Sequence, residues 1–362
     1  MNLPFRIQDE AGTEAVLSID GSFGAPGLEL GHWPGNRTPR ELKHDLSTGC
    51  ALRFMELPES ERGRLSEGLV AIANNHVDTD GVLALFALLR PKEALARREA
   101  LLQTAEAGDR FRTPTEAAFQ LDQIITVLFD EKRSPWRAHT GGMSRRERHE
   151  WCSLRIVDEL PAWLDGDIEA LEDLWRGPLA RLRSDREDLA AAQCDDLVHL
   201  SSILWTAPMN RASTAAGETF FDPGRHALFG ATRADRVVVL GPSTAGTHCR
   251  MIIGTGSFFD LVDEQVPARP QLALLVARLN ELEGSRDGDA CAWRSDAQDH
   301  ASPELWFGVT KTGSFPTHAL AYSRPSKLDA LRIKSELIEG LRAAFLMSDE
   351  EAESSDLDWM NV

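Results

Sequence analysis

The chain has 362 residues, of which 42% are hydrophobic and 27% charged, and its formal net charge is −18. This composition is typical of a folded globular protein, and the length allows roughly two domains. The negative charge disfavours duplex nucleic acid as a partner. No apolar run approaches the roughly 18 residues of a membrane helix, and the N-terminal residues show no secretory signal, so we expect a cytoplasmic protein without a membrane partner. Five scattered cysteines argue against a disulfide framework and a structural zinc site.

The first part of the chain is predicted to contain two strands and a helix. Residues 14–20 and 28–36 have the composition of strands, and the second ends in a Pro-Gly turn. Thr38, Pro39 and Glu41 then form the pattern of a capped helix start.

The most informative stretch is 69–91, LVAIANNHVDTDGVLALFALLRP. Its first five residues favour a buried strand, and the apolar run after Gly81 favours a helix that stops before Pro91. His76, Asp78 and Asp80 stand between them. In open α/β sheets, ligands bind at the carboxyl ends of the strands, so these side chains stand where a site is expected.

The middle of the chain is predicted to be mostly helical. Residues 92–107 favour one helix ending at Gly108, and the region from 144 to about 205 favours a large helical block. Small and turn-forming residues follow, and they indicate a boundary between an N-terminal domain at 1–206 and a C-terminal domain at 218–347.

The C-terminal domain is predicted to be a smaller α+β unit. Strands are expected at 236–240, 249–254, 290–294, 305–309 and 318–322, and helices at 271–283 and 326–345. The acidic tail at 348–362 is predicted to be disordered. The chain as a whole is therefore expected to be an α/β protein, with a sheet and the helical block in its N-terminal domain.

The spacing of His76, Asp78 and Asp80 predicts a metal site. In an extended backbone, residues two apart leave from the same face, so one imidazole and two carboxylates can reach one cation. This ligand set suits manganese, magnesium or iron better than zinc. The helix beginning at Gly81 offers N–H groups to an anion, so a metal beside it suits a phosphate group.

Two simpler structures could also place acids in this loop. Asp78 and Asp80 could cap the helix while His76 merely ends the strand, although capping requires only one of the acids. A calcium-binding EF-hand is excluded, because His76 occupies the first ligand position and Ala87 stands where a bidentate glutamate is needed.

The motif HVDTDG at 76–81 resembles the first motif of the DHH phosphoesterase superfamily, in its His-x-Asp-x-Asp-Gly variant. More loosely, the whole chain is similar to uncharacterised bacterial proteins that share this motif. The resemblance implies a two-domain α/β hydrolase that binds manganese or magnesium between its domains and cleaves phosphoester or phosphoanhydride bonds. It also implies that His76, Asp78 and Asp80 are metal ligands.

Other residues could complete such a site. Asp109 is our first choice as a further ligand, because it follows the predicted helix end at Gly108 and could face the same cleft. His32, Asp45 and His139 are interpreted as surface or structural residues, since no spacing rule ties them to the loop.

The leading hypothesis is a hydrolase of a phosphorylated small molecule or nucleotide, with His76, Asp78 and Asp80 as catalytic metal ligands. Arginines between 133 and 148 would offset phosphate charge, unless that stretch is a solvated helix flank. An alternative is a non-catalytic binding protein that keeps the loop, because the chain has no Asp-His-His triplet. A metal enzyme of another class, such as an iron oxygenase, would need a second histidine from elsewhere.

Overall fold

The computed structural model describes residues 3–208, 221–286, 288–311 and 322–343. The chain forms two compact units: unit 1 comprises Met1–Leu182 and Phe259–Gln265, and unit 2 comprises Arg183–Phe258 and Val266–Val362. Helices and sheets are both present, so the protein is of the α/β class, as predicted. The predicted boundary at 207–217 falls largely outside the described residues and stays a prediction, and the predicted disordered tail at 348–362 also lies outside them.

Unit 1 is built on a parallel sheet with the strand order β1-β4-β2-β3. The strands are β1 (Phe5–Ile7), β2 (Val16–Ile19), β3 (Gly27–Leu30) and β4 (Ile72–Asn74). Because the strands are parallel, their carboxyl ends lie on one edge of the sheet. Asp20 is the first residue after β2, and His32 and His76 are the second residues after β3 and β4, so all three reach that edge.

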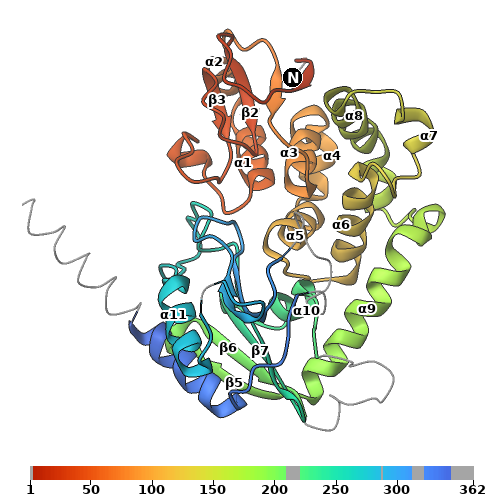
Figure 1. Ribbon diagram of the computed structural model, residues 1–362. Helices are drawn as coiled ribbons and strands as arrows, with labels where there is room; N and C mark the ends of the chain where they lie inside the picture. The colour runs from red at the N-terminus through yellow and green to blue at the C-terminus, as the bar shows by residue number, and fades with distance from the viewer. Residues whose placement is uncertain (1–2, 209–220, 287, 312–321, 344–362) are drawn as a thin grey trace, which may run out of the picture. The chain divides into compact units, whose positions relative to one another are not determined.

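The helices of unit 1 include one, α3, that is buried along almost its whole length. They are η1 (Arg40–Leu42), α1 (Ser47–Glu56), α2 (Glu59–Leu65), α3 (Thr79–Leu89), α4 (Pro91–Ala96), α5 (Arg98–Arg110), α6 (Glu116–Phe129), α7 (Arg137–Thr140), α8 (Arg145–Leu164), η2 (Glu169–Leu171) and α9 (Glu172–Ala191), which runs on into unit 2. α3 is buried from Thr79 to Leu88 and packs against α1, α5 and α8 (Figure 1). A helix that is apolar on almost every side belongs in the centre of a core.

Three predictions about these helices are wrong. Residues 92–107 are not one helix, since α4 ends at Ala96 and α5 begins at Arg98. Gly108 does not end a helix but lies inside α5, where a Cβ would come within 2.8 Å of Thr79 Cβ. The glycine is therefore explained by the close approach of α5 to α3. The helical block ends at Ala191, because two strands of unit 2 follow it.

Unit 2 contains a six-stranded sheet in the order β5-β6-β7-β8-β10-β9, in which only β6 and β7 pair in parallel. Its elements are β5 (Gln193–Leu197), η3 (Val198–Leu200), β6 (Ser202–Thr206), α10 (Arg225–Gly230), β7 (Arg236–Ser243), β8 (Gly246–Ile253), α11 (Leu272–Glu283), β9 (Ala292–Ser295) and β10 (Glu304–Gly308). α11 and a helix at 330–343 share a core with the sheet.

The predicted α+β character of this part of the chain is confirmed. Four of the five predicted strands and both predicted helices are present, while the strand expected at 318–322 falls almost wholly outside the described residues. None of the described helices, in either unit, has both the length and the apolar character that crossing a bilayer requires.

Candidate metal centre

Acidic and histidine side chains gather at the carboxyl edge of the unit 1 sheet, in two groups that share Asp20. The inner group consists of Asp20, His32, Asp80 and Asp109, and the outer group consists of Asp20, His76 and Asp78. In each group, one ligand atom from every residue lies within 4.8 Å of the others. Atoms bound to one cation at about 2.0–2.6 Å can be this far apart, so each group has dimensions suitable for one ion.

Asp20 occupies the turn that follows β2. Its backbone has a φ of 49°, in the left-handed region, which aspartate tolerates better than most residues. The Ser47 hydroxyl donates to Asp20 Oδ1 at 2.9 Å. The other oxygen, Oδ2, is buried, lies 3.2 Å from His76 Nε2 and makes no hydrogen bond of good geometry to a described residue. Asp20 is thus held by one oxygen and presents the second to the cluster.

The loop does not have the extended geometry that its spacing predicted. α3 begins at Thr79, so Asp78 is the N-cap and Asp80 lies in the first helical turn. Asp78 Oδ1 accepts from the backbone N–H of Gly81 at 2.8 Å, which confirms a capping role for this one acid. Because the helix already begins at Thr79, Asp80 lies in the inner group, whereas His76 and Asp78 lie in the outer group.

Asp80 is held by the start of α1. Its two oxygens accept from the backbone N–H groups of Ser47 at 2.6 Å and Thr48 at 2.8 Å. Unpaired N–H groups at a helix N-terminus stabilise a carboxylate. These bonds fix the direction of a side chain that is fully buried.

Both histidines are oriented by a hydrogen bond at Nδ1. His32 Nδ1 lies 2.7 Å from the backbone oxygen of Asp45, and His76 Nδ1 lies 2.7 Å from Asn75 Oδ1. A carbonyl oxygen only accepts, so Nδ1 of His32 carries the hydrogen, and its Nε2 faces the cluster as an acceptor when the ring is neutral. Metal-binding histidines are typically oriented in this way.

The inner group concentrates acceptors in a buried space. His32 Nε2 lies 3.0 Å from Asp109 Oδ2 and makes no hydrogen bond to a described residue. Burial and then the charge of Asp80 raise the pKa of Asp109. His32 Nε2 and Asp109 Oδ2 can lie this close together only if one of the two atoms carries a proton or if both bind a cation. The donor set therefore fits a divalent ion.

The outer group is more open. The side chains of His76 and Asp78 are 26% and 36% exposed. Burial by itself would lower the pKa of His76, but the neighbouring Asp78 and Asp20 outweigh it and raise the value to about 11. Burial raises the pKa of Asp20, and repulsion from Asp78 adds to this effect. Without an ion, a proton on His76 therefore offsets part of the negative charge.

Gly81 leaves room for the cluster. A Cβ at this position would lie 2.6 Å from Asn74 Nδ2 and 2.8 Å from Asp20 Oδ2. Any larger residue would therefore displace the side chain of Asp20, the residue that both groups share. The glycine at this position is therefore required by the lack of space around it.

Comparison with known proteins assigns the chain to a family. Residues 1–352 match a family of unknown function, DUF6687. The chain belongs to DUF6687. No curated protein matches it. Membership in DUF6687 carries no activity with it, so the function has to be argued from the site.

The structure of this DUF6687 member places some of the other candidate residues where the sequence did not predict them. Asp109 and His32 join the inner group, although His32 was interpreted as structural. Asp45 supports His32 through its backbone oxygen. His139 packs against Trp151, with ring centroids 4.6 Å apart, and belongs to neither group. Asp20 was missed, although an acid at the end of an apolar strand is the signal that could have found it.

The arginines between residues 133 and 148 form ion pairs with acidic residues close to them. Arg133 pairs with Asp130 and Arg146 pairs with Glu150, at 2.7 and 3.1 Å. Arg148 lies 3.8 Å from Glu131. These pairs fit a solvated helix flank. A contribution of these arginines to phosphate binding stays a prediction.

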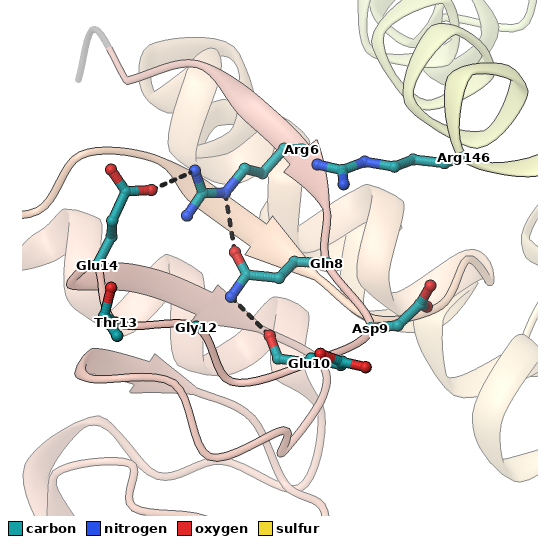
Figure 2. Close-up of a pocket in the computed structure, with 8 residues that line it drawn as sticks. All are labelled: Arg6, Gln8, Asp9, Glu10, Gly12, Thr13, Glu14 and Arg146. Carbon is teal, nitrogen blue, oxygen red and sulfur yellow. Dashed lines mark hydrogen bonds and ion pairs between the residues drawn. The ribbon is translucent and has the colours of Figure 1, made fainter.

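A surface pocket of about 710 Å³ lies elsewhere in unit 1 (Figure 2). It is lined by Arg6, Gln8, Asp9, Glu10, Gly12, Thr13, Glu14 and Arg146. Arg6 already donates to Gln8 and pairs with Glu14, both at 2.9 Å (Figure 2). No lining residue belongs to the inner or outer group, so this pocket is separate from the candidate metal centre.

Proposed function

We propose that this protein is a divalent-metal-dependent hydrolase of phosphoester or phosphoanhydride bonds in a small molecule or nucleotide. One observation carries the proposal: two groups of acid and histidine ligands share Asp20 at the carboxyl ends of parallel strands. Buried acceptors without hydrogen-bond partners among the described residues support a cation in their midst.

The ligand chemistry favours manganese or magnesium. Each group combines one imidazole with two or three carboxylates, and oxygen-rich sets of this kind suit hard divalent ions. Such ions, when bound, polarise a phosphoryl oxygen and lower the pKa of a bound water. Asp20 would serve both ions, and the inner residues would be shielded from solvent.

The outer group is the side that a substrate can reach. His76 and Asp78 are partly exposed, whereas His32 and Asp80 are fully buried. A phosphate would therefore approach at the outer group. His76, held by Asn75, and Asp78, held at the start of α3, would keep their positions while it binds.

The non-catalytic alternative is less well supported. It predicts the loop acids standing alone on a convex surface, but further acids and a second histidine surround them. Neither group has the two histidines and one carboxylate of an iron oxygenase, since each contains one histidine. We also propose a cytoplasmic location, which suits a chain whose five cysteines are all unpaired thiols.

Hydrolysis assays on the full chain test this proposal. Pyrophosphate, nucleotides and phosphomonoesters would be offered with Mn²⁺, Mg²⁺ or a chelator. We expect turnover that the chelator abolishes and that Asp78→Asn lowers at least about 100-fold, while keeping the helix cap. Asp9→Asn, a change at an exposed acid outside both groups, should retain turnover. Equal turnover by Asp78→Asn and the wild type would overturn the proposal.

A further inference from the structure

Residues 259–265, which we call the strap, belong to unit 1, although the chain before and after them belongs to unit 2. The Phe259 ring stacks on the His32 ring, with centroids 3.9 Å apart and planes 13° from parallel. The backbone N–H of Asp260 donates to the backbone oxygen of His32 at 2.8 Å. The strap therefore contacts an inner-group histidine through both ring and backbone.

Asp45 joins the strap to the same histidine. Its Oδ1 accepts from the backbone N–H groups of Val262 and Asp263 at 2.7 and 2.8 Å. Its own backbone oxygen accepts from His32 Nδ1 at 2.7 Å. Since Asp45 is almost completely buried, these bonds are protected from competition with water.

The end of the strap is held by two arginines of unit 1. Glu264 pairs with Arg110 at 2.5 Å and with Arg112 at 2.6 Å. Arg110 directly follows the inner-group residue Asp109 in α5. Attraction to the arginines outweighs the effect of burial and lowers the pKa of Glu264 to about 2, so this acid is charged at neutral pH.

We propose that the strap supports the inner group and that strap docking and cation binding are thermodynamically linked. Phe259 and Asp45 are positioning residues: together they hold the His32 ring so that Nε2 faces Asp20, Asp80 and Asp109. A cation that requires this orientation stabilises the docked strap, and the docked strap raises the affinity for the cation by the same factor. This inference rests on the proposed metal centre.

Calorimetry with Mn²⁺ on the full chain tests the link in the His76→Gln background, where only the inner group keeps its full ligand set. We expect Phe259→Ala to weaken Mn²⁺ binding about 10-fold or more, and Phe259→Tyr, which keeps the stacking ring, to restore it. The matched control is Phe129→Ala, because Phe129 is also a half-buried aromatic residue that contacts a histidine, His149, outside the centre. This control should bind Mn²⁺ normally.

Amide hydrogen exchange of the unmutated chain gives a second test that does not depend on a variant. Saturating Mn²⁺ should slow amide exchange at Val262 and Asp263 at least about 10-fold. Linkage requires this factor to equal the factor by which the docked strap raises Mn²⁺ affinity. Unchanged exchange, or equal Mn²⁺ affinity in Phe259→Ala, would overturn the inference. Mn²⁺ binding with slowed exchange but without hydrolysis would contradict only the proposed activity. If the wild type binds no Mn²⁺, both proposals fail.

Discussion

His32 and His76 each belong to one candidate ligand group, while Asp20 belongs to both. Each histidine is fixed by a bond at Nδ1, so its Nε2 has a defined direction. The two groups should therefore be separable by single substitutions, which makes the histidines the most informative residues to change.

The first prediction concerns the number of ions. We expect the wild type to bind two Mn²⁺ per chain, and His32→Gln and His76→Gln each to bind one, because each change removes a ligand from only one group. Metal analysis after dialysis measures the stoichiometry. His139→Gln, a change at a histidine outside both groups, is the control. Two ions retained in either site variant would show that the groups are not the ligands.

The second prediction concerns His149 and the pH dependence of stability. Burial, together with Arg148 and Arg145, lowers the pKa of His149 to about 4. Between pH 6.5 and 4 the unfolded chain therefore binds a proton that the folded chain does not. His149 should lower the free energy of unfolding as the pH falls through this range, by at most about 1.4 kcal/mol per pH unit.

Denaturant titrations of the wild type and His149→Phe would measure this effect. The substitution keeps an aromatic ring opposite Phe129 and removes the titrating group. The difference in unfolding free energy between the two proteins should therefore change between pH 6.5 and 4. A constant difference over that range would contradict the assignment.

At the residue scale, the sequence indicated four of the six residues that make up the two groups. His76, Asp78 and Asp80 were found because they are close together in a motif, and Asp109 was a reasoned choice. Asp20 and His32 follow strands that become neighbours only when the sheet forms. No spacing in the sequence encodes that pairing, so these residues could not be tied to the loop.

At the element scale, α3 connects the core to the site. Its buried length packs among α1, α5 and α8, while its N-cap supplies Asp78 and its first turn supplies Asp80 and Gly81. A change in the first turn should therefore affect both stability and ligand geometry.

The third prediction compares two glycines in helices. Gly81→Ala should cost about 1–3 kcal/mol of unfolding free energy and weaken Mn²⁺ binding about 10-fold or more, because its Cβ would press on Asp20. Gly63→Ala is the matched control: this exposed glycine of α2 has no atom within 4 Å of an added Cβ. It should stabilise the chain by up to about 1 kcal/mol. Wild-type Mn²⁺ affinity in Gly81→Ala would contradict the proposed crowding.

The sequence predicted several apolar strands correctly, but β6, which is also apolar, was assigned to the helical block. The strands of unit 2 that carry its core, such as β7 and β8, were recognised from their apolar runs. β5 was missed because its sequence, QCDDL, is polar and mostly exposed, so nothing distinguished it from the end of a helical block. Its place in the sheet comes from pairing with β6.

At the scale of the whole molecule, the two units differ in how the charge of their buried carboxylates is neutralised. In unit 2, Glu304 accepts from Arg225, Arg250, Lys311 and Tyr322 at 2.5 to 3.0 Å. This carboxylate is matched by cations of the protein, whereas the centre in unit 1 has more carboxylates than cations. The surplus is what an external ion would offset.

The fourth prediction follows from this contrast. Glu304→Gln should destabilise the protein by about 3–5 kcal/mol, because it leaves buried arginines without their shared anion. Asp296→Asn removes a more exposed partner of Lys311 and should cost about 1 kcal/mol or less. Thermal unfolding measures both. Equal effects of the two changes would contradict the account of unit 2.

We infer that Asp20 organises a divalent metal centre in unit 1. Calorimetric titration of Mn²⁺ into the full chain and into Asp20→Asn tests it most directly, since asparagine tolerates the left-handed backbone and removes only the charge. We predict two bound ions in the wild type and at least about 100-fold weaker binding of both ions in the variant. Wild-type Mn²⁺ binding by Asp20→Asn, or no binding by the wild type, would contradict the claim.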